Sequence, residues 1–187
     1  MFRQRSYRPY RAKYAKYSNE TVAFNAGLTA DLDGNLSFPE ESGEGGVTSR
    51  GLLIVPPTNV LGNRKVKNFT IKITANGNDD QIFAALVYVP EGTLASPLQV
   101  GGPVQSMYEP NQNVICTFII PPNCTRDANS AITDSSAPTQ IVVSTRLARN
   151  LNTGDSVVLV FSTPNGLSCT NEEPLTVSGT CNFAIKY

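Results

Sequence analysis

The first 17 residues hold the densest group of chemically active side chains in the chain. Six of these residues are cationic, five are aromatic and none is acidic. Cationic groups neutralise phosphates and release their counterions, while aromatic faces stack on unpaired bases of any identity. The pattern therefore predicts an arm that binds single-stranded nucleic acid without sequence preference. The residues expected to make these contacts are Arg3, Arg5, Tyr7, Arg8, Tyr10, Arg11, Lys13, Tyr14, Lys16 and Tyr17.

Two alternatives stay open for this arm. A basic segment at a chain end is also typical of a solvated tail. Basic residues followed by Pro9 and Tyr10 resemble nuclear import signals of the proline-tyrosine class, which is compatible with nucleic-acid binding. The spacing of the four tyrosines would align them in one stripe if a helix began near Pro9, and such a stripe could pack under the rest of the protein.

Charge is divided unevenly between this arm and the remainder of the chain. The whole chain has 15 cationic and 15 acidic side chains, so its formal net charge is zero. The remaining 170 residues keep nine cations and all 15 acids, which gives them a formal charge of −6. This split indicates an arm for an anionic partner and a body that does not bind one.

Catalytic chemistry is poorly represented in the chain. The sequence contains no histidine, which excludes Ser-His-Asp and Cys-His catalysis as well as histidine-ligated zinc. It contains no tryptophan platform of the kind that sandwich glycosidases use. We therefore expect no enzyme, no catalytic residue, no metal and no cofactor. Calcium held between subunits by loop carboxylates is the alternative to a solvated acidic loop, and the carboxylates concerned are Asp31, Asp33, Glu40, Glu41 and Glu44.

The elements that carry this arm are predicted to be strands. Short runs rich in Val, Ile, Phe and Thr recur along the chain, each bounded by Gly, Pro, Asn or Asp. Asn-Gly at residues 76–77 and the segment 150–155 predict tight turns, because Asn and Gly tolerate a positive φ. Eight strands are expected, at Thr21–Thr29, Ser49–Val55, Val66–Thr74, Gln81–Val89, Asn113–Ile120, Gln140–Ala148, Asp155–Thr163 and Thr176–Tyr187.

Long, unequal connections between these strands favour an eight-stranded antiparallel jelly-roll sandwich over an up-and-down barrel. The expected domains are a basic, tyrosine-rich arm at residues 1–20 and a single all-β domain at residues 21–187. The run at 81–89 is almost continuously apolar, so we expect a partner subunit or a long loop to cover its second face.

The N-terminus lacks the apolar stretch of a secretory signal, and no run is long enough to span a membrane, so a soluble protein that is not exported is expected. Reduced thiols are then the favoured state of the four cysteines, with disulfides as the alternative. Cys116 and Cys181 lie in predicted strands and are expected to be small core residues, whereas Cys124 and Cys169 lie in predicted loops.

Four segments of the chain together point to a known family: FTIKITAN at Phe69–Asn76, DDQIFAALVYVPEG at Asp79–Gly92, MYEPNQNV at Met107–Val114 and TRLARNLNTGD at Thr145–Asp155. They resemble segments of the capsid proteins of circovirus-like, Rep-encoding circular single-stranded DNA viruses. The resemblance implies a jelly-roll subunit, an icosahedral shell in a virion assembled in the host nucleus or cytoplasm, and a basic N-terminus facing a packaged genome. The arm departs from this family in being shorter, less arginine-rich and richer in tyrosine.

Assembly of such a shell would need contacts between copies of the chain, made by loops and strand edges. Two candidate contact residues are arginines, Arg146 and Arg149, which could pair with phosphate if they face inward or with carboxylates if they lie at a subunit interface. A host receptor or glycan is a further expected partner, and membrane insertion is not expected. The alternative function is a carbohydrate-binding or receptor-binding sandwich, such as a lectin or fibre head, without a shell. The candidate interface residues are Tyr108, Glu109, Pro110, Arg146 and Arg149.

Overall fold

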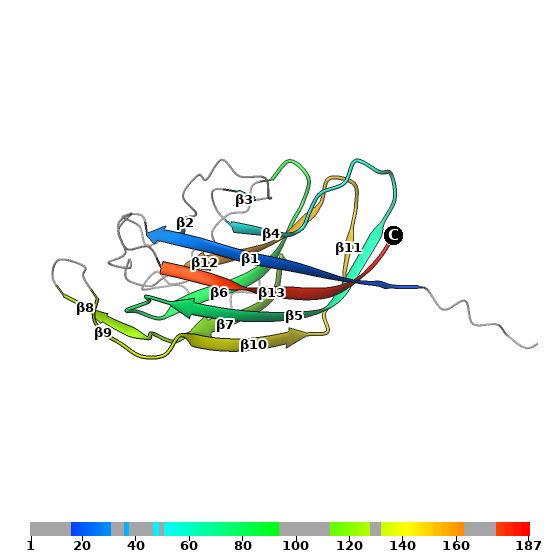
Figure 1. Cartoon of the computed structure of the whole chain (residues 1–187). Helices are drawn as coiled ribbons and strands as arrows, with labels where there is room; N and C mark the ends of the chain where they lie inside the picture. The colour runs from blue at the N-terminus through cyan, green and yellow to red at the C-terminus, as the bar shows by residue number, and fades with distance from the viewer. Residues whose placement is uncertain are drawn as a thin grey trace, which may run out of the picture.

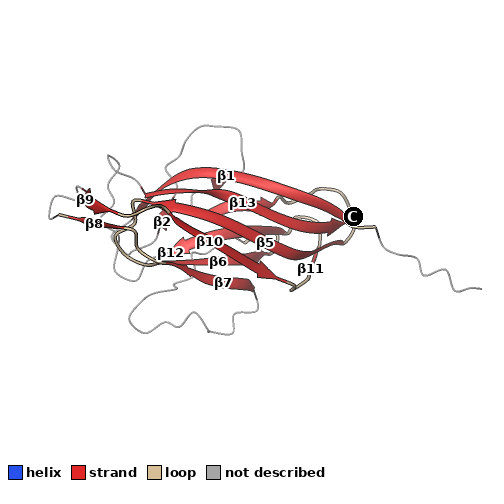
Figure 2. Cartoon of the chain, turned by 60° about the horizontal axis from the view of Figure 1, so that its bottom comes forward, coloured by secondary structure: helices blue, strands red, loops and turns tan. Residues whose placement is uncertain are grey.

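The computed structural model describes residues 16–30, 36–37, 47–48, 51–93, 113–127, 132–162 and 175–187. Within these residues the protein is all-β, with 13 strands and no helix. All strand pairs are antiparallel. Two sheets pack face to face, and a small third sheet lies at the end of the molecule opposite to the C-terminus (Figures 1 and 2).

The first sheet has the strand order β10-β5-β13-β1-β2, with β11 paired to the beginning of β5. Its long strands alternate between apolar and polar residues, as expected for strands with one face on the core and one in water. The strands of this sheet are β1 (Ser18–Ala30), β2 (Leu36–Ser37), β5 (Arg64–Asn76), β10 (Thr139–Thr145), β11 (Arg149–Leu151) and β13 (Leu175–Lys186).

The second sheet has the order β3-β4-β12-β6-β7. Its central strands read SVVLVFS and IFAALVYV, without the polar alternation of the first sheet. The strands are β3 (Val47–Thr48), β4 (Gly51–Val55), β6 (Ile82–Val89), β7 (Val114–Ile120) and β12 (Ser156–Ser162), and the small third sheet consists of β8 (Cys124–Arg126) and β9 (Ile132–Ser135).

Eight main strands pair in a nested order along the chain. Taken in sequence, the first pairs with the last, the second with the seventh, the third with the sixth and the fourth with the fifth. Every connection between consecutive main strands, except that from β6 to β7, passes from one sheet to the other. These main strands are β1, β4, β5, β6, β7, β10, β12 and β13.

Each of the eight predicted segments coincides with one main strand, and the two predicted turns contain glycines with positive φ, Gly77 at 85° and Gly154 at 82°. Both turns connect strands of different sheets. The first strand begins three residues before the predicted segment Thr21–Thr29, because Ser18 to Glu20 also pair with β13. Five strands of two to four residues fall in segments predicted as connections or turns, because so short a run has no periodicity to detect: β2, β3, β8, β9 and β11.

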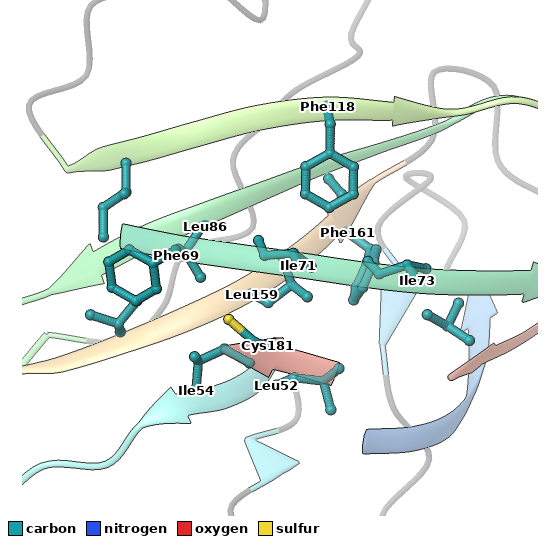
Figure 3. Close-up of a cluster of buried hydrophobic side chains, with 14 of the residues drawn as sticks. Leu52, Ile54, Phe69, Ile71, Ile73, Leu86, Phe118, Leu159, Phe161 and Cys181 are labelled. Atoms are coloured by element: carbon teal, nitrogen blue, oxygen red, sulfur yellow. The ribbon is translucent and has the colours of Figure 1, made fainter. Parts of the chain in front are cut away.

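The core lies between the two sheets (Figure 3). Phe69, Ile71 and Ile73 of β5 point toward Leu86 and Phe161 of the second sheet, and all five side chains are buried. Cys181 is also buried in this core and Cys116 packs against it, as predicted. Truncating a fully buried Leu such as Leu86 to Ala is expected to cost about 2–5 kcal/mol.

The second sheet is buried on its outward face as well. Successive residues of β6 and β12 alternate between the central core and a separate apolar cluster, which we call the outer cluster. The expectation that the strand at 81–89 is covered on both faces is confirmed. The burial exists within a single chain, so no partner subunit is needed to produce it. The outer cluster comprises Ala85, Val87, Val89, Val158 and Val160.

Candidate nucleic-acid interface

The outward side of β1, β13, β5 and β10, which we call the open face, contrasts with the outer cluster. The register aligns the outward residues of neighbouring strands, as in the row Val142, Lys72, Thr180 and Ala23. Between Ile71 and Ile73, which are buried, Lys72 is exposed to solvent. Apart from Val142, Gly27 and two alanines, the outward residues of these four strands are Lys, Thr, Ser, Asn and Gln.

All four lysines beyond residue 17 occupy outward positions on this face: Lys65, Lys67, Lys72 and Lys186. No Asp or Glu occupies an outward position of β1, β5, β10 or β13. Glu20 of β1 is opposite Phe183, a core residue, and so belongs to the inward set of positions. The open face is therefore cationic, although the body of the chain as a whole is acidic.

Two of these lysines lie directly opposite each other. Lys65 of β5 pairs with Lys186 of β13, and both side chains are exposed. Side chains directly across an antiparallel pair lie about 5 Å apart at Cβ, and like charges in that position destabilise a sheet. An anion bound between the two ammonium groups would remove this repulsion.

A bulge in β5 adjoins the third lysine. Asn68 has a φ of 56°, and the register between β5 and β13 shifts at this point, so that Asn68 and Phe69 together oppose Phe183. Asn tolerates this left-handed conformation because its short side chain bonds locally to the backbone. The bulge lies where β5 exchanges its partner β11 for β10, and it immediately follows Lys67.

The predicted arm enters the first sheet beside these lysines. The Nζ atom of Lys67 lies 3.8 Å from the centroid of the Tyr17 ring, a cation–π contact worth about 0.5–1 kcal/mol. Figure 1 shows the first described residues of the chain leaving β1 at the same end as the C-terminus. Of the predicted arm residues, Lys16 and Tyr17 are thus described, and eight lie outside the described residues: Arg3, Arg5, Tyr7, Arg8, Tyr10, Arg11, Lys13 and Tyr14.

Of the predicted subunit-interface residues, the structure describes Arg146 and Arg149. Arg146 is exposed just after β10. Arg149 of β11 is half-buried on the inward side and donates a hydrogen bond from a guanidinium nitrogen to the Val114 carbonyl oxygen, at 3.3 Å. That contact joins the two sheets within one chain. Tyr108, Glu109 and Pro110 lie outside the described residues.

A buried polar cluster, which sequence reasoning missed, joins the two sheets at the end where the arm begins. Arg64 of β5 donates to the Asp155 carbonyl oxygen at 2.9 Å and to the Pro56 carbonyl oxygen at 2.9 Å. The Asp155 carboxylate accepts from the Tyr88 hydroxyl at 2.7 Å and from the backbone N–H groups of Asn152, at 2.7 Å, and Glu91, at 3.1 Å. We call Arg64, Tyr88 and Asp155 the clamp.

The electrostatics of the clamp are those of a structural site. Burial of Asp155 alone would raise its pKa, but the hydrogen bonds from Tyr88, Asn152 and Glu91, with the charge of Arg64, hold that pKa below its usual value. Burial, followed by the hydrogen bond to Asp155, raises the pKa of Tyr88 to about 12. Both carboxylate oxygens are engaged by donors, so Asp155 is not available as a general base.

A second polar cluster joins the connections at the opposite end, and it was also missed. The buried Asn123 side chain accepts from the backbone N–H groups of Gly77 and Asn78, each at 3.1 Å, and donates to the Ala75 carbonyl oxygen at 3.0 Å. Asn78 in turn donates from its side chain to the Pro121 carbonyl oxygen at 2.7 Å. The turn after β5 is thereby tied to the segment that follows β7.

The described residues contain no group of three or more His, Cys, Asp or Glu side chains that could hold a metal ion. Burial raises the pKa of the Cys116 thiol to about 11 and that of the Cys181 thiol to about 12, so neither thiol is a nucleophile at neutral pH. Among the described residues there is no helix long and apolar enough to cross a membrane.

Only part of this candidate interface could be predicted from the sequence. Lys67 and Lys72 lie in the predicted strand Val66–Thr74 and Lys65 immediately precedes it, so the three could have been assigned to one face from the alternation of β5, with allowance for the bulge at Asn68. The pairing of Lys65 with Lys186 could not, because it depends on which strands are neighbours. A search of protein-family models and of curated proteins gives no match to the chain.

Proposed function

We propose that the protein is a viral coat protein that self-assembles into an icosahedral shell and packages single-stranded DNA through its basic N-terminal arm. The observation that carries the proposal is a nested two-sheet sandwich whose first strand is continuous with a segment of six cations and no acid. The resemblance of four sequence segments to circovirus-like capsid proteins implies the same function.

We further propose that the eight main strands form a jelly roll. Pairing of the first strand with the last, the second with the seventh, the third with the sixth and the fourth with the fifth supports this topology. This nested pairing arises when one long antiparallel hairpin folds back on itself, so that a few long connections link the two sheets of the sandwich. Jelly rolls are used in viral shells and in lectins, so the arm is what favours a shell.

Two features of the described structure suit a shell subunit. The clamp joins the sheets at one end, and Asn123 with Asn78 ties the connections at the other. Because these contacts join the two sheets at one end of the subunit and the connections at the other, its strand edges and connections keep a constant orientation relative to one another. A closed shell needs such constancy, because each contact is individually weak and the symmetry repeats the same contact many times.

Electron microscopy tests this function directly. Purified full-length protein should form uniform spheres at some salt concentration, with a ratio of absorbance at 260 nm to that at 280 nm that indicates nucleic acid. Deleting residues 1–15, which leaves Lys16 and all of β1 in place, should leave the spheres and remove most of the nucleic acid. Monomers or small oligomers under every salt condition, without nucleic acid, would favour the lectin or fibre-head alternative.

A further inference from the structure

We propose that the open face is a second binding surface for single-stranded nucleic acid and takes the same strand that the arm binds. The inference extends the proposed function, because it places part of the packaged strand on the folded domain itself. Its ligand is the phosphate backbone, and its principal residues are Lys65, Lys67, Lys72 and Lys186.

The distribution of charge points to an anionic partner. The chain beyond residue 17 has six more acidic than cationic side chains, yet no acid lies at an outward position of β1, β5, β10 or β13. All four lysines of that region are collected there. The chain beyond residue 17, despite its excess of acids, therefore presents a cationic surface to which a polyanion would bind.

The spacing of the lysines suits an extended chain of phosphates. Residues in a strand rise about 3.3 Å each, so Lys65 and Lys67 are about 7 Å apart along β5 and Lys72 lies roughly 16 Å further. Lys186 extends the same group sideways onto β13. The positions between them hold Thr70, Thr180 and Asn182, side chains that donate hydrogen bonds to phosphate oxygens.

The arm and the open face are continuous. Tyr17 is the last residue before β1, and its ring contacts the ammonium group of Lys67. A strand bound along the arm therefore reaches the lysines at the beginning of β5 without crossing acidic surface of β1 or β13. The pair of Lys65 and Lys186, which repel each other in the free protein, lies at this point of entry.

A second copy of the chain is the competing occupant, and the composition of the face opposes it. Protein interfaces are enriched in aromatic residues and Met at their centres and depleted of Lys. Along β10, β5 and β13 the open face offers one large exposed apolar side chain, Val142, which is 66% exposed. In a twofold contact made by this face, the four lysines of one copy would also lie opposite the four lysines of the other copy, with no acid on the face to pair with them.

The experiment compares the full-length protein with a variant carrying K65Q, K67Q, K72Q and K186Q. Binding of a fluorescent oligothymidylate is measured by anisotropy over a range of salt concentrations. Each lost phosphate contact lowers the slope of log Kd against log salt by about 0.7, so the slope should fall by up to about 3 and affinity by about tenfold or more at low salt. The same four positions changed to Arg should retain binding.

A matched pair of single variants separates local charge from net charge. V142E places a carboxylate on the open face opposite Lys72, whereas I132E places one on β9, at the far end of the molecule from the arm. Both side chains are exposed, 66% for Val142 and 43% for Ile132, and both variants change the charge of the chain equally. V142E should weaken binding and I132E should not.

The outcomes distinguish this inference from the proposed function. If shells form and carry nucleic acid but the Gln variant binds oligothymidylate like the wild type, the open face is not a binding surface and the arm acts alone. If the Gln variant binds normally but no longer forms shells, the face is a contact between subunits and the inference is overturned. If the Gln variant loses affinity but no preparation forms shells, the open face binds nucleic acid and the coat-protein proposal fails.

Discussion

The two sheets of this protein differ in what lies on their outward faces. The first sheet presents Lys, Thr and Asn on the outward side of β5, and this strand alternates between buried and less buried positions on both sides of the bulge at Asn68. The second sheet buries Val158 and Val160 of β12 on its outward face as completely as it buries its core residues. The first sheet thus has one face on the core and one polar, lysine-bearing face, whereas the second sheet is buried on both faces.

The order of apolar and polar residues in a strand indicates how many of its two faces are buried. Alternation in β5 indicates one wet face, and the continuous run in β6 indicates two dry faces. The contrast between the faces can be tested by placing the same chemical group on each of them, and by disturbing the contacts that hold the sheets in register.

The largest effect is expected from a charge introduced into the outer cluster. Val160→Glu buries a carboxylate at a site that is 2% exposed and should lower the free energy of unfolding by about 4 kcal/mol or prevent folding. Val142→Glu, on the open face at 66% exposure, should change it by less than about 0.5 kcal/mol. Urea denaturation followed by circular dichroism compares the two, and equal midpoints would show that the second sheet has a wet outward face.

A glycine on the inward side of the first sheet should give the next largest effect. A Cβ atom at Gly179 would overlap the Lys72 carbonyl oxygen and lie 3.0 Å from Cζ of Phe24, and backbone cannot move aside as a side-chain end can. Gly179→Ala should therefore destabilise the protein by about 3 kcal/mol. Ser178→Ala, on the open face one residue earlier, is the control and should be nearly neutral. A neutral Gly179→Ala would mean that β13 and β5 are further apart than described.

The clamp, which joins the two sheets, should make stability depend on acid pH. The pKa of folded Asp155 is below its usual value, whereas in the unfolded chain it returns to about 3.9. Its contribution is therefore complete above pH of about 4 and is lost as the pH falls through the folded pKa. Asp155→Asn should cost about 2 kcal/mol at neutral pH, since the amide cannot accept all three hydrogen bonds.

Thermal unfolding measured from neutral pH to pH of about 2 checks this linkage. The difference between wild type and Asp155→Asn should shrink as the medium becomes acidic. Tyr88→Phe, which removes only the hydroxyl donor, should cost about 1 kcal/mol. A constant difference across the range would show that the carboxylate of Asp155 is not what the clamp depends on.

The smallest effect concerns the pair of lysines on the open face. Lys65→Gln should raise the free energy of unfolding by a few tenths of a kcal/mol at low salt, because it removes the repulsion from Lys186. The gain should vanish at high salt, where the repulsion is screened. Thr74→Gln, an uncharged change elsewhere on β5, should show no such salt dependence. A loss of stability in Lys65→Gln would indicate a structural role for Lys65.

Parts of the fold and of the candidate site follow from the order of the amino acids alone. The apolar run in β6 predicted both that strand and its coverage on two faces, while the segment Val66–Thr74 was predicted as a strand only. The acid-free composition of the arm predicts an anionic partner, and this stays a prediction. The short strands were missed, and so was the clamp, because Arg64 and Asp155 are 91 residues apart and no local pattern indicates that they meet.

By itself the sequence determined the class of structure, the positions of the main strands and the separation of a cationic arm from an acidic body. These are local properties, set by the spacing of apolar residues, by turn-forming Asn and Gly, and by composition. Only the tertiary structure decided that Lys186 lies beside Lys65, that Asn123 secures the turn at Gly77, and that one face of an acidic body is free of acids. Those properties depend on which strands become neighbours, and strand pairing is a long-range choice that no window of sequence contains.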